Sequence, residues 1–87
     1  MQNEHTLNEL GTGRRAIVLK LRAHGSMRRR LLDIGLTEGA AVECVGRSPA
    51  GDPAAYLIRG AVIAIRSEDS IDVVIEQEVS NNALSQE

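Results

Sequence analysis

The side chains best suited to bind a transition metal are two histidines and one cysteine, and they lie far apart in the sequence. His5, His24 and Cys44 form none of the C-x-x-C, H-x-H or H-x-x-x-H pairs that are typical of zinc and iron sites. Cys44 alternates with polar residues in a segment that has the pattern of a half-buried strand, where a free cysteine commonly acts as a small hydrophobic residue. We therefore predict no metal site and no cofactor site in a single chain.

Nucleophilic catalysis is a second possibility, but turns and helix caps explain each serine of the central region. We expect Ser26 to be the N-cap of a helix and the others to lie in turns, namely Ser48, Ser67 and Ser70. The chain has no G-x-S-x-G or H-E-x-x-H motif. The Gly11-Thr12-Gly13 segment lacks the Gly-Lys-Ser/Thr ending of a phosphate-binding loop. We therefore predict no catalytic residue and no enzymatic activity.

Three consecutive arginines are the strongest charge feature of the sequence. At about 100° per residue, Arg28, Arg29 and Arg30 would spread across the face of a helix that its apolar residues leave free. One interpretation is a solvated face whose aliphatic stems cover the edge of the core. The other is a docking surface for an acidic partner or for phosphate groups. Residues 1–47 carry eight Arg or Lys against five acids, and residues 48–87 carry two against seven, so one basic and one acidic face are expected.

A short helix at residues 27–34 should position these arginines. Met27, Leu31 and Ile34 are spaced three or four residues apart and would share the face that packs on the core. Gly35 follows where a helix needs a left-handed residue to bond its last carbonyl groups. We predict that Gly35 ends the helix.

The remaining elements are short strands separated by turn formers. A helical or 3₁₀ turn is expected at residues 7–10, and strands are predicted at residues 16–21, 41–47, 55–59, 61–66 and 71–75. Gly39 closes the turn into the second strand, and Gly60 marks a tight hairpin or a bulge. Residues 48–53 form an exposed loop that contains Pro49, Asp52 and Pro53. Five strands with one helix between the first two fit a small, strongly bent barrel of the mainly β class.

Length and composition limit the class of protein further. A chain of 87 residues makes one domain, residues 1–87, with an ordered core at about 7–76 and flexible ends at 1–5 and 80–87. It has no Phe, no Trp and one Tyr, so it lacks the aromatic platforms of single-strand nucleic-acid binding and of proline-rich peptide recognition. One cysteine allows no internal disulfide, and neither a leader nor a membrane-spanning run is present. The sequence predicts a cytoplasmic protein without direct membrane insertion.

The segment from Arg30 to Gly39 resembles the RLLDLGLTPG segment of the ferrous iron transport protein A (FeoA) family. Three further blocks resemble the same family in the expected order, namely Gly51-Asp52-Pro53, Arg59-Gly60 and Ile63-Ala64-Ile65-Arg66. The likeness covers residues 7–75. The chain differs from the family pattern at Glu38, where a proline is expected, and at Ala54 and Ala61, where larger apolar or aromatic residues are common.

The resemblance implies an SH3-like barrel and a non-catalytic accessory role in bacterial ferrous iron uptake. Its expected partner is the membrane transporter ferrous iron transport protein B (FeoB), whose soluble part is a GTPase domain. Through this partner the protein would lie at the inner membrane. We expect partner contacts at the arginine helix face and at the loop of residues 48–53. A nucleic-acid-binding barrel, which the acidity and missing aromatics disfavour, and a transition-metal carrier are the alternatives.

Overall fold

The computed structural model describes residues 4–78, which form a mainly β domain as predicted. The elements in chain order are β1 (His5–Thr6), the 3₁₀ helix η1 (Leu7–Glu9), β2 (Arg15–Leu21), α1 (Gly25–Asp33), β3 (Ala41–Arg47), β4 (Ala54–Ile58), β5 (Ala61–Ile65), α2 (Ser67–Ser70) and β6 (Val73–Gln77). No helix among these residues is long and apolar enough to cross a membrane. Of the flexible ends predicted at 1–5 and 80–87, residues 1–3 and 80–87 lie outside the described residues.

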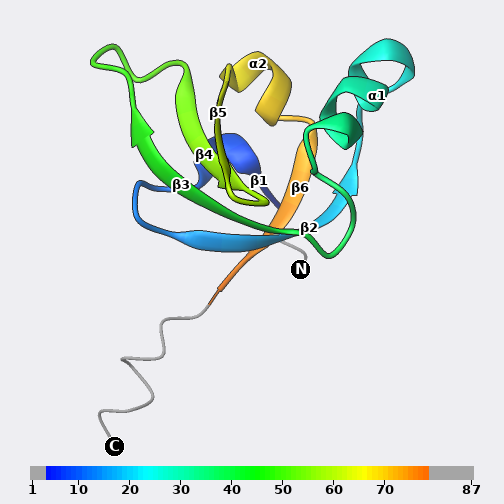
Figure 1. Cartoon of the computed structure of the whole chain (residues 1–87), viewed down its shortest axis with the longest axis horizontal. Coiled ribbons are helices and arrows are strands. Elements are labelled where there is room, and N and C mark those ends of the chain that lie inside the picture. The colour runs from blue at the N-terminus through cyan, green and yellow to red at the C-terminus, as the bar shows by residue number, and fades with distance from the viewer. Residues whose placement is uncertain (1–3, 79–87) are drawn as a thin grey trace, which may run out of the picture.

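The strands form one antiparallel sheet in the order β1-β6-β2-β3-β4-β5. Figure 1 shows this sheet as a strongly bent surface, with α1 and α2 on the same side of it. The bend agrees with the predicted small barrel, but β1 and β5 are two separate edges, so the sheet is not closed. The sixth strand is β1, in which His5 lies opposite Ile75 of β6. We expected His5 to lie in a frayed end, and this was wrong. Its pairing with β6 involves a residue seventy positions away, which local sequence patterns do not show.

Two strand predictions need correction. In β2, a bulge between Val18 and Lys20 interrupts the pairing with β6, and Leu19 within it is 46% exposed although its neighbour Val18 is buried. The last strand begins at Val73, not at residue 71. Ile71 instead follows α2 as its C-cap and is 49% exposed. The alternation of apolar and polar residues alone did not predict that Leu19 and Ile71 are exposed while nearby apolar residues are buried.

Helix α1 begins two residues earlier than predicted and ends one residue earlier, at Asp33, with Ile34 as its C-cap. His24 is its N-cap and no side chain bonds the first turn, so Ser26 does not act as the cap. At the other end, Gly35 has φ 108° and donates to the Leu32 carbonyl, while Leu36 donates to the Leu31 carbonyl (3.0 and 3.1 Å). These two bonds form a Schellman motif, which confirms Gly35 as the residue that stops the helix.

Two other glycines occupy turns that need a positive φ. Gly39 (φ 87°) is the third residue of a turn closed by the Ala40 amide on the Thr37 carbonyl (3.0 Å), the pattern of a type II turn. Gly60 (φ 84°) and Arg59 (φ 53°) connect β4 to β5, with Ile58 opposite Ala61. The predicted tight hairpin therefore has a two-residue turn, in which both central residues are left-handed.

Aliphatic residues build the core around a single aromatic side chain. Tyr56 is fully buried and its hydroxyl donates to the Leu7 carbonyl (3.2 Å). Burial is the main reason that the pKa of Tyr56 is raised, and the nearby Arg47 guanidinium partly opposes the shift. Cys44 and Val42 are buried side by side on one face of β3, as predicted.

Candidate functional site

The predicted arginine face is present on α1. Arg28, Arg29 and Arg30 are all exposed, while Leu31 is buried and anchors the helix to the core. Met27 and Ile34 complete the apolar stripe as partly buried residues, as their spacing predicted. Part of the outer face is hollowed into a shallow groove of about 290 Å³, which is lined by Gly25, Arg28, Arg29, Leu32 and Asp33.

These three arginines form no ion pair within residues 4–78, a property that they share with Arg14, Arg47, Arg59 and Arg66. Among the residues that the structure describes, Arg15 pairs with Glu78 (Nε–Oε1 3.8 Å), and both Arg22 and Lys20 pair with Glu4. No described carboxylate forms an ion pair with a guanidinium of α1. Their charges are thus available to an anionic group from outside the chain.

The second predicted contact region, residues 48–53, lies elsewhere. Figure 1 shows the loop between β3 and β4 on the opposite side of the molecule from α1. Pro49 is exposed and Pro53 is half-buried. Asp52 points inward, where its carboxylate accepts hydrogen bonds from the Ser67 amide (2.9 Å) and hydroxyl (3.1 Å). The two predicted regions therefore do not form one site, and Asp52 holds the start of α2.

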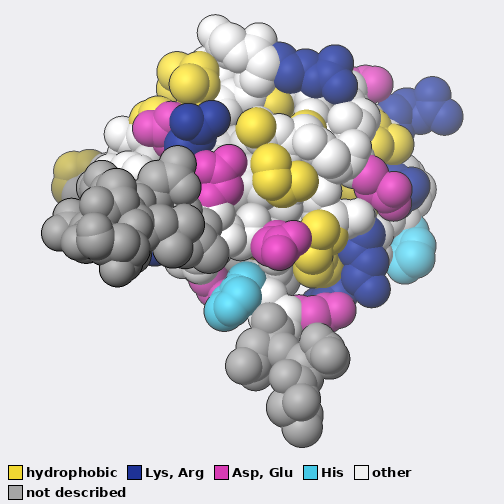
Figure 2. All heavy atoms as spheres, turned by 90° about the horizontal axis from the view of Figure 1, so that it is seen from below, with side chains coloured by type: hydrophobic (Ala, Val, Ile, Leu, Met, Phe, Trp, Pro, Cys, Tyr) yellow, Lys and Arg dark blue, Asp and Glu magenta, His cyan; other side chains and the backbone are white. Residues whose placement is uncertain are grey.

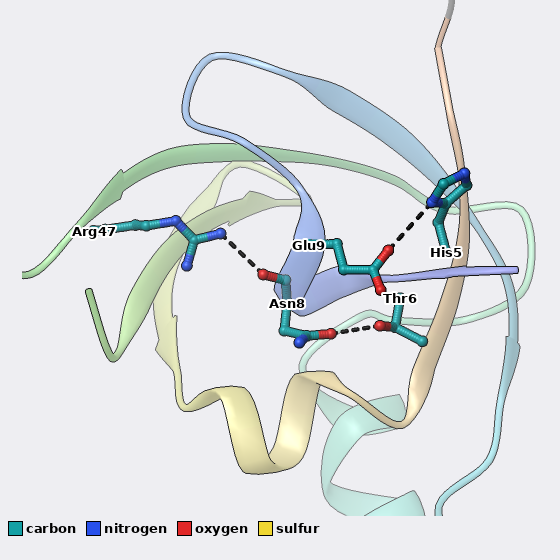
Figure 3. Close-up of polar contacts among 5 residues, drawn as sticks. All are labelled: His5, Thr6, Asn8, Glu9 and Arg47. Carbon is teal, nitrogen blue, oxygen red and sulfur yellow. Dashed lines mark hydrogen bonds and ion pairs between the residues drawn. The ribbon is translucent and has the colours of Figure 1, made fainter.

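Sequence reasoning did not identify the role of Arg47, whose hydrogen bonds connect β3 to the segment around η1 and to the loop before β4. Its guanidinium donates to the backbone carbonyls of Asn8 (3.0 Å) and Leu10 (2.8 Å), beside η1, and to that of Gly51 (3.4 Å) in the loop. Figure 3 shows Arg47 reaching toward η1 from the end of β3, with the Thr6–Asn8 and His5–Glu9 contacts beside it. These contacts serve the fold. No local signal in the sequence distinguishes Arg47 from a surface arginine.

The structure does not bring the predicted metal candidates together. His5 Nδ1 lies 3.2 Å from Glu9 Oε1 in an exposed pair, and Cys44 is fully buried. Figure 2 shows the two histidines well apart on the lower face, among scattered basic, acidic and hydrophobic side chains. Within residues 4–78, no three His, Cys, Asp or Glu side chains are grouped so that they could hold a metal ion. These residues do not fit a metal centre built by one chain.

Comparison with known proteins agrees with the fold and with the motifs. The family model of the FeoA domain matches residues 5–77. An Fe(2+) transport protein A/Fe(2+) transporter FeoB fusion protein of Porphyromonas gingivalis is 33% identical over 79 residues. That match covers 91% of this chain and 9% of the fusion protein, so the chain spans less than a tenth of this relative.

Solved structures of similar proteins have the same architecture. The FeoA-like protein of Clostridium acetobutylicum superimposes with a TM-score of 0.82 at 26% identity, over 92% of this chain and 93% of that one. FeoA of Stenotrophomonas maltophilia, complexed with zinc, has a TM-score of 0.76 at 28% identity, over 85% and 95% of the two chains. It is described as a prokaryotic SH3 domain protein, which agrees with the SH3-like fold expected from the motifs. On the family match, which covers almost every described residue, the chain belongs to the FeoA family.

Proposed function

We propose that this protein is a non-catalytic accessory of bacterial ferrous iron transport and that it acts by binding FeoB. The observation that carries the proposal is the Porphyromonas gingivalis relative, in which a segment similar to this chain is part of one polypeptide with an FeoB transporter. Joining two modules in one polypeptide raises their effective concentration for each other, which is useful when the modules interact. The proposal places the chain in the cytoplasm, at the membrane that holds the transporter.

Helix α1 is the surface we propose for this contact. Its three exposed arginines have no carboxylate partner among the described residues, so binding an acidic surface would not break an existing ion pair. Arginine also forms bidentate bonds with carboxylates and phosphates, and so gives geometric specificity. The GTPase domain that the FeoA resemblance implies for FeoB binds a phosphate-bearing nucleotide, so its surface is a reasonable place for such a contact.

The test measures binding of the full chain to the soluble GTPase domain of FeoB from the same organism. The Arg28→Glu, Arg29→Glu double variant should raise the Kd by at least about tenfold and flatten its salt dependence, because charge steering and pairing are lost. Its melting temperature should stay within a few degrees of the wild type, because exposed arginines contribute little to folding.

The matched control is the Arg14→Glu, Arg15→Glu double variant. It makes the same change in charge at the start of β2. The strand is about 20 Å long and α1 follows its far end, so these two arginines are distant from the helix. The control should change the Kd by less than about twofold. Equal losses in both variants would show a nonspecific charge effect. Unchanged binding in a folded Arg28→Glu, Arg29→Glu variant would move the contact to the loop of residues 48–53. No binding by the wild-type chain would reject the GTPase domain as the partner.

Two control titrations address the alternative functions. Ferrous iron added to the chain alone should bind weakly, because the described residues hold no cluster of metal ligands. Duplex DNA should not be retained at physiological salt, since the chain carries a net charge of −2. Tight, stoichiometric iron binding would favour a metal carrier, and salt-dependent binding to duplex would favour a nucleic-acid-binding barrel.

A further inference from the structure

The strand β5 forms an edge of the sheet that lacks the usual protection against pairing. It pairs only with β4 within residues 4–78, in a continuous register from Ala61 to Ile65. Natural edge strands commonly carry a charge, a proline or a bulge that prevents another strand from joining them. The sequence of β5 is Ala-Val-Ile-Ala-Ile and has none of these. The opposite edge, β1, has only two residues and is therefore a poor template.

Its exposed side chains and backbone groups are arranged to accept a further strand. Val62 is 63% exposed, the highest value among the large hydrophobic residues that the structure describes. The turn at Arg59 and Gly60 makes Ile58 and Ala61 partners, so alternate residues of β5 direct their backbone groups to β4. Val62 and Ala64 direct theirs to the free edge, where no described backbone group bonds them.

The charges beside the edge favour a second copy of this chain as the strand that joins it. Arg59, at the hairpin end of β5, is exposed and basic. At the other end, α2 contributes Glu68 and Asp69 after Arg66, so that end is net acidic. In an antiparallel pair related by a two-fold axis, the basic end of each strand meets the acidic end of the other.

We propose that two copies of this protein associate through antiparallel pairing of their β5 edges. Opposing Ala64 with Ala64 of the second copy places Val62 against the stem of Arg66 and directs Arg59 toward the acidic start of α2, at Glu68 and Asp69. Two other registers also oppose residues that face the free edge. Val62 opposite Val62 brings Arg66 toward Arg59, and Val62 opposite Ala64 sets Arg66 opposite Gly60, beside Arg59, so like charges disfavour both. The paired edges continue both sheets into one. Arg30 lines a small pocket with Ala64 and Ile65 and so borders this edge, whereas Arg28 and Arg29 line the separate groove of α1. This inference does not depend on the proposed function.

The interface is small, so the dimer should be weak and depend on concentration. A stable interface buries about 1,200–2,000 Å², more than two five-residue strands can supply. Sedimentation of the full chain from micromolar to millimolar concentration should show a monomer–dimer equilibrium. Over the same range, amide exchange of Val62 and Ala64 should slow with concentration, whereas exchange of Ile63, which already bonds to β4, should not change.

Substitutions test the edge and then the register. Val62→Lys should raise the dimer Kd by at least about tenfold, because an edge lysine opposes pairing. Val62→Thr keeps the β-branched shape and should retain the dimer to within a few-fold. Arg59→Glu and Glu68→Arg should each weaken it, and the double variant should recover it by restoring opposite charges.

Each contrary result overturns the proposal. A wild-type chain that remains a monomer at millimolar concentration leaves β5 without the proposed partner. A dimer that persists in Val62→Lys lies on another surface. Failure of the charge-swapped double variant to recover association, with both single variants folded, rejects the register.

Discussion

Helices α1 and α2 lie on the same side of one bent sheet, yet they are held by different kinds of contact (Figure 1). The nine residues of α1 are fixed by an aliphatic stripe around buried Leu31 and by the glycine stop at Gly35. The four residues of α2 are too few for such a stripe. They depend instead on Asp52, which bonds the Ser67 amide and hydroxyl, and on packing against η1.

This difference explains which helix can carry a function on its surface. Packing through one face leaves the opposite face of α1 free to vary, and there the three arginines are exposed. The position of α2 depends on polar groups of a distant loop, so changes near Asp52 or Ser67 would affect stability first. We therefore expect substitutions around α2 to change folding and those on the outer face of α1 to change binding.

The largest expected effect concerns the end of α1. A β-carbon at Gly35 would lie 2.9 Å from Ile58 Cγ2 and 3.0 Å from Arg59 Cδ, in a backbone with φ 108°. Gly35→Val should lower the free energy of unfolding by about 2–4 kcal/mol, through left-handed strain and these close contacts. In an 87-residue domain, urea denaturation and a fall in melting temperature of ten degrees or more would show this.

Comparison of Gly35→Ala with Gly39→Ala, which add the same β-carbon at two left-handed positions, separates the two causes. Gly39 is also left-handed (φ 87°), but a β-carbon there meets no atom within 4 Å. Its loss should be about 1 kcal/mol, the conformational cost alone. If Gly39→Ala destabilised the protein as much as Gly35→Ala, the close approach of β4 and its turn to the helix end would have no energetic role.

The anchor of α2 should give the next largest effect. Asp52→Ala removes an acceptor of two hydrogen bonds and should cost about 1–2 kcal/mol, while Asp52→Asn, which keeps an acceptor oxygen, should cost less. Ser26→Ala in α1 is the matched control and should change stability by less than about 0.5 kcal/mol, because Ser26 caps nothing. Urea denaturation measures all three. Equal losses of stability in Asp52→Ala and Ser26→Ala would contradict the view that α2, unlike α1, depends on a side-chain hydrogen bond at its start.

The difference between local and distant contacts also determines how much of this structure the sequence could predict. Local patterns were sufficient for β3, for burial of Cys44, for the apolar stripe of α1 and for Gly35, because each depends on neighbours within a few residues. The bulge at Leu19, the strand β1 and the helix α2 depend on pairing or bonding with distant segments. A single sequence does not show those partners. The arginine surface was found because charge and helical spacing are both local, whereas the inward role of Asp52 was not.

A smaller effect is expected beneath η1, at the only aromatic residue of the chain. Tyr56→Phe removes the hydrogen bond to the Leu7 carbonyl and should cost about 1 kcal/mol at neutral pH. The pKa of Tyr56 is raised above 10.0, so at higher pH the unfolded chain loses this proton first. Stability from this group is therefore constant below about pH 10 and falls as the pH rises toward the folded-state pKa.

Alkaline titration checks this prediction directly, because tyrosinate absorbance reports one residue. The native protein should titrate at a pKa above that of the urea-unfolded chain. Wild-type stability should fall more steeply above about pH 10 than that of Tyr56→Phe. Identical folded and unfolded titrations would mean that the hydroxyl reaches solvent in the native state.

The smallest expected effect is a gain, in the turn that connects α1 to β3. Glu38 is the second residue of the turn closed by Thr37 and Ala40, with Gly39 third, and proline is favoured at that position of a type II turn. The Glu38 amide donates no backbone bond within residues 4–78, so a proline there would lose none. Glu38→Pro should raise the free energy of unfolding by about 0.4–1 kcal/mol, by restricting the unfolded chain. Glu38→Ala, which removes only the side chain, should stay within about 0.5 kcal/mol of the wild type. A proline variant no more stable than the alanine variant would show that this turn does not fit the fixed φ of proline.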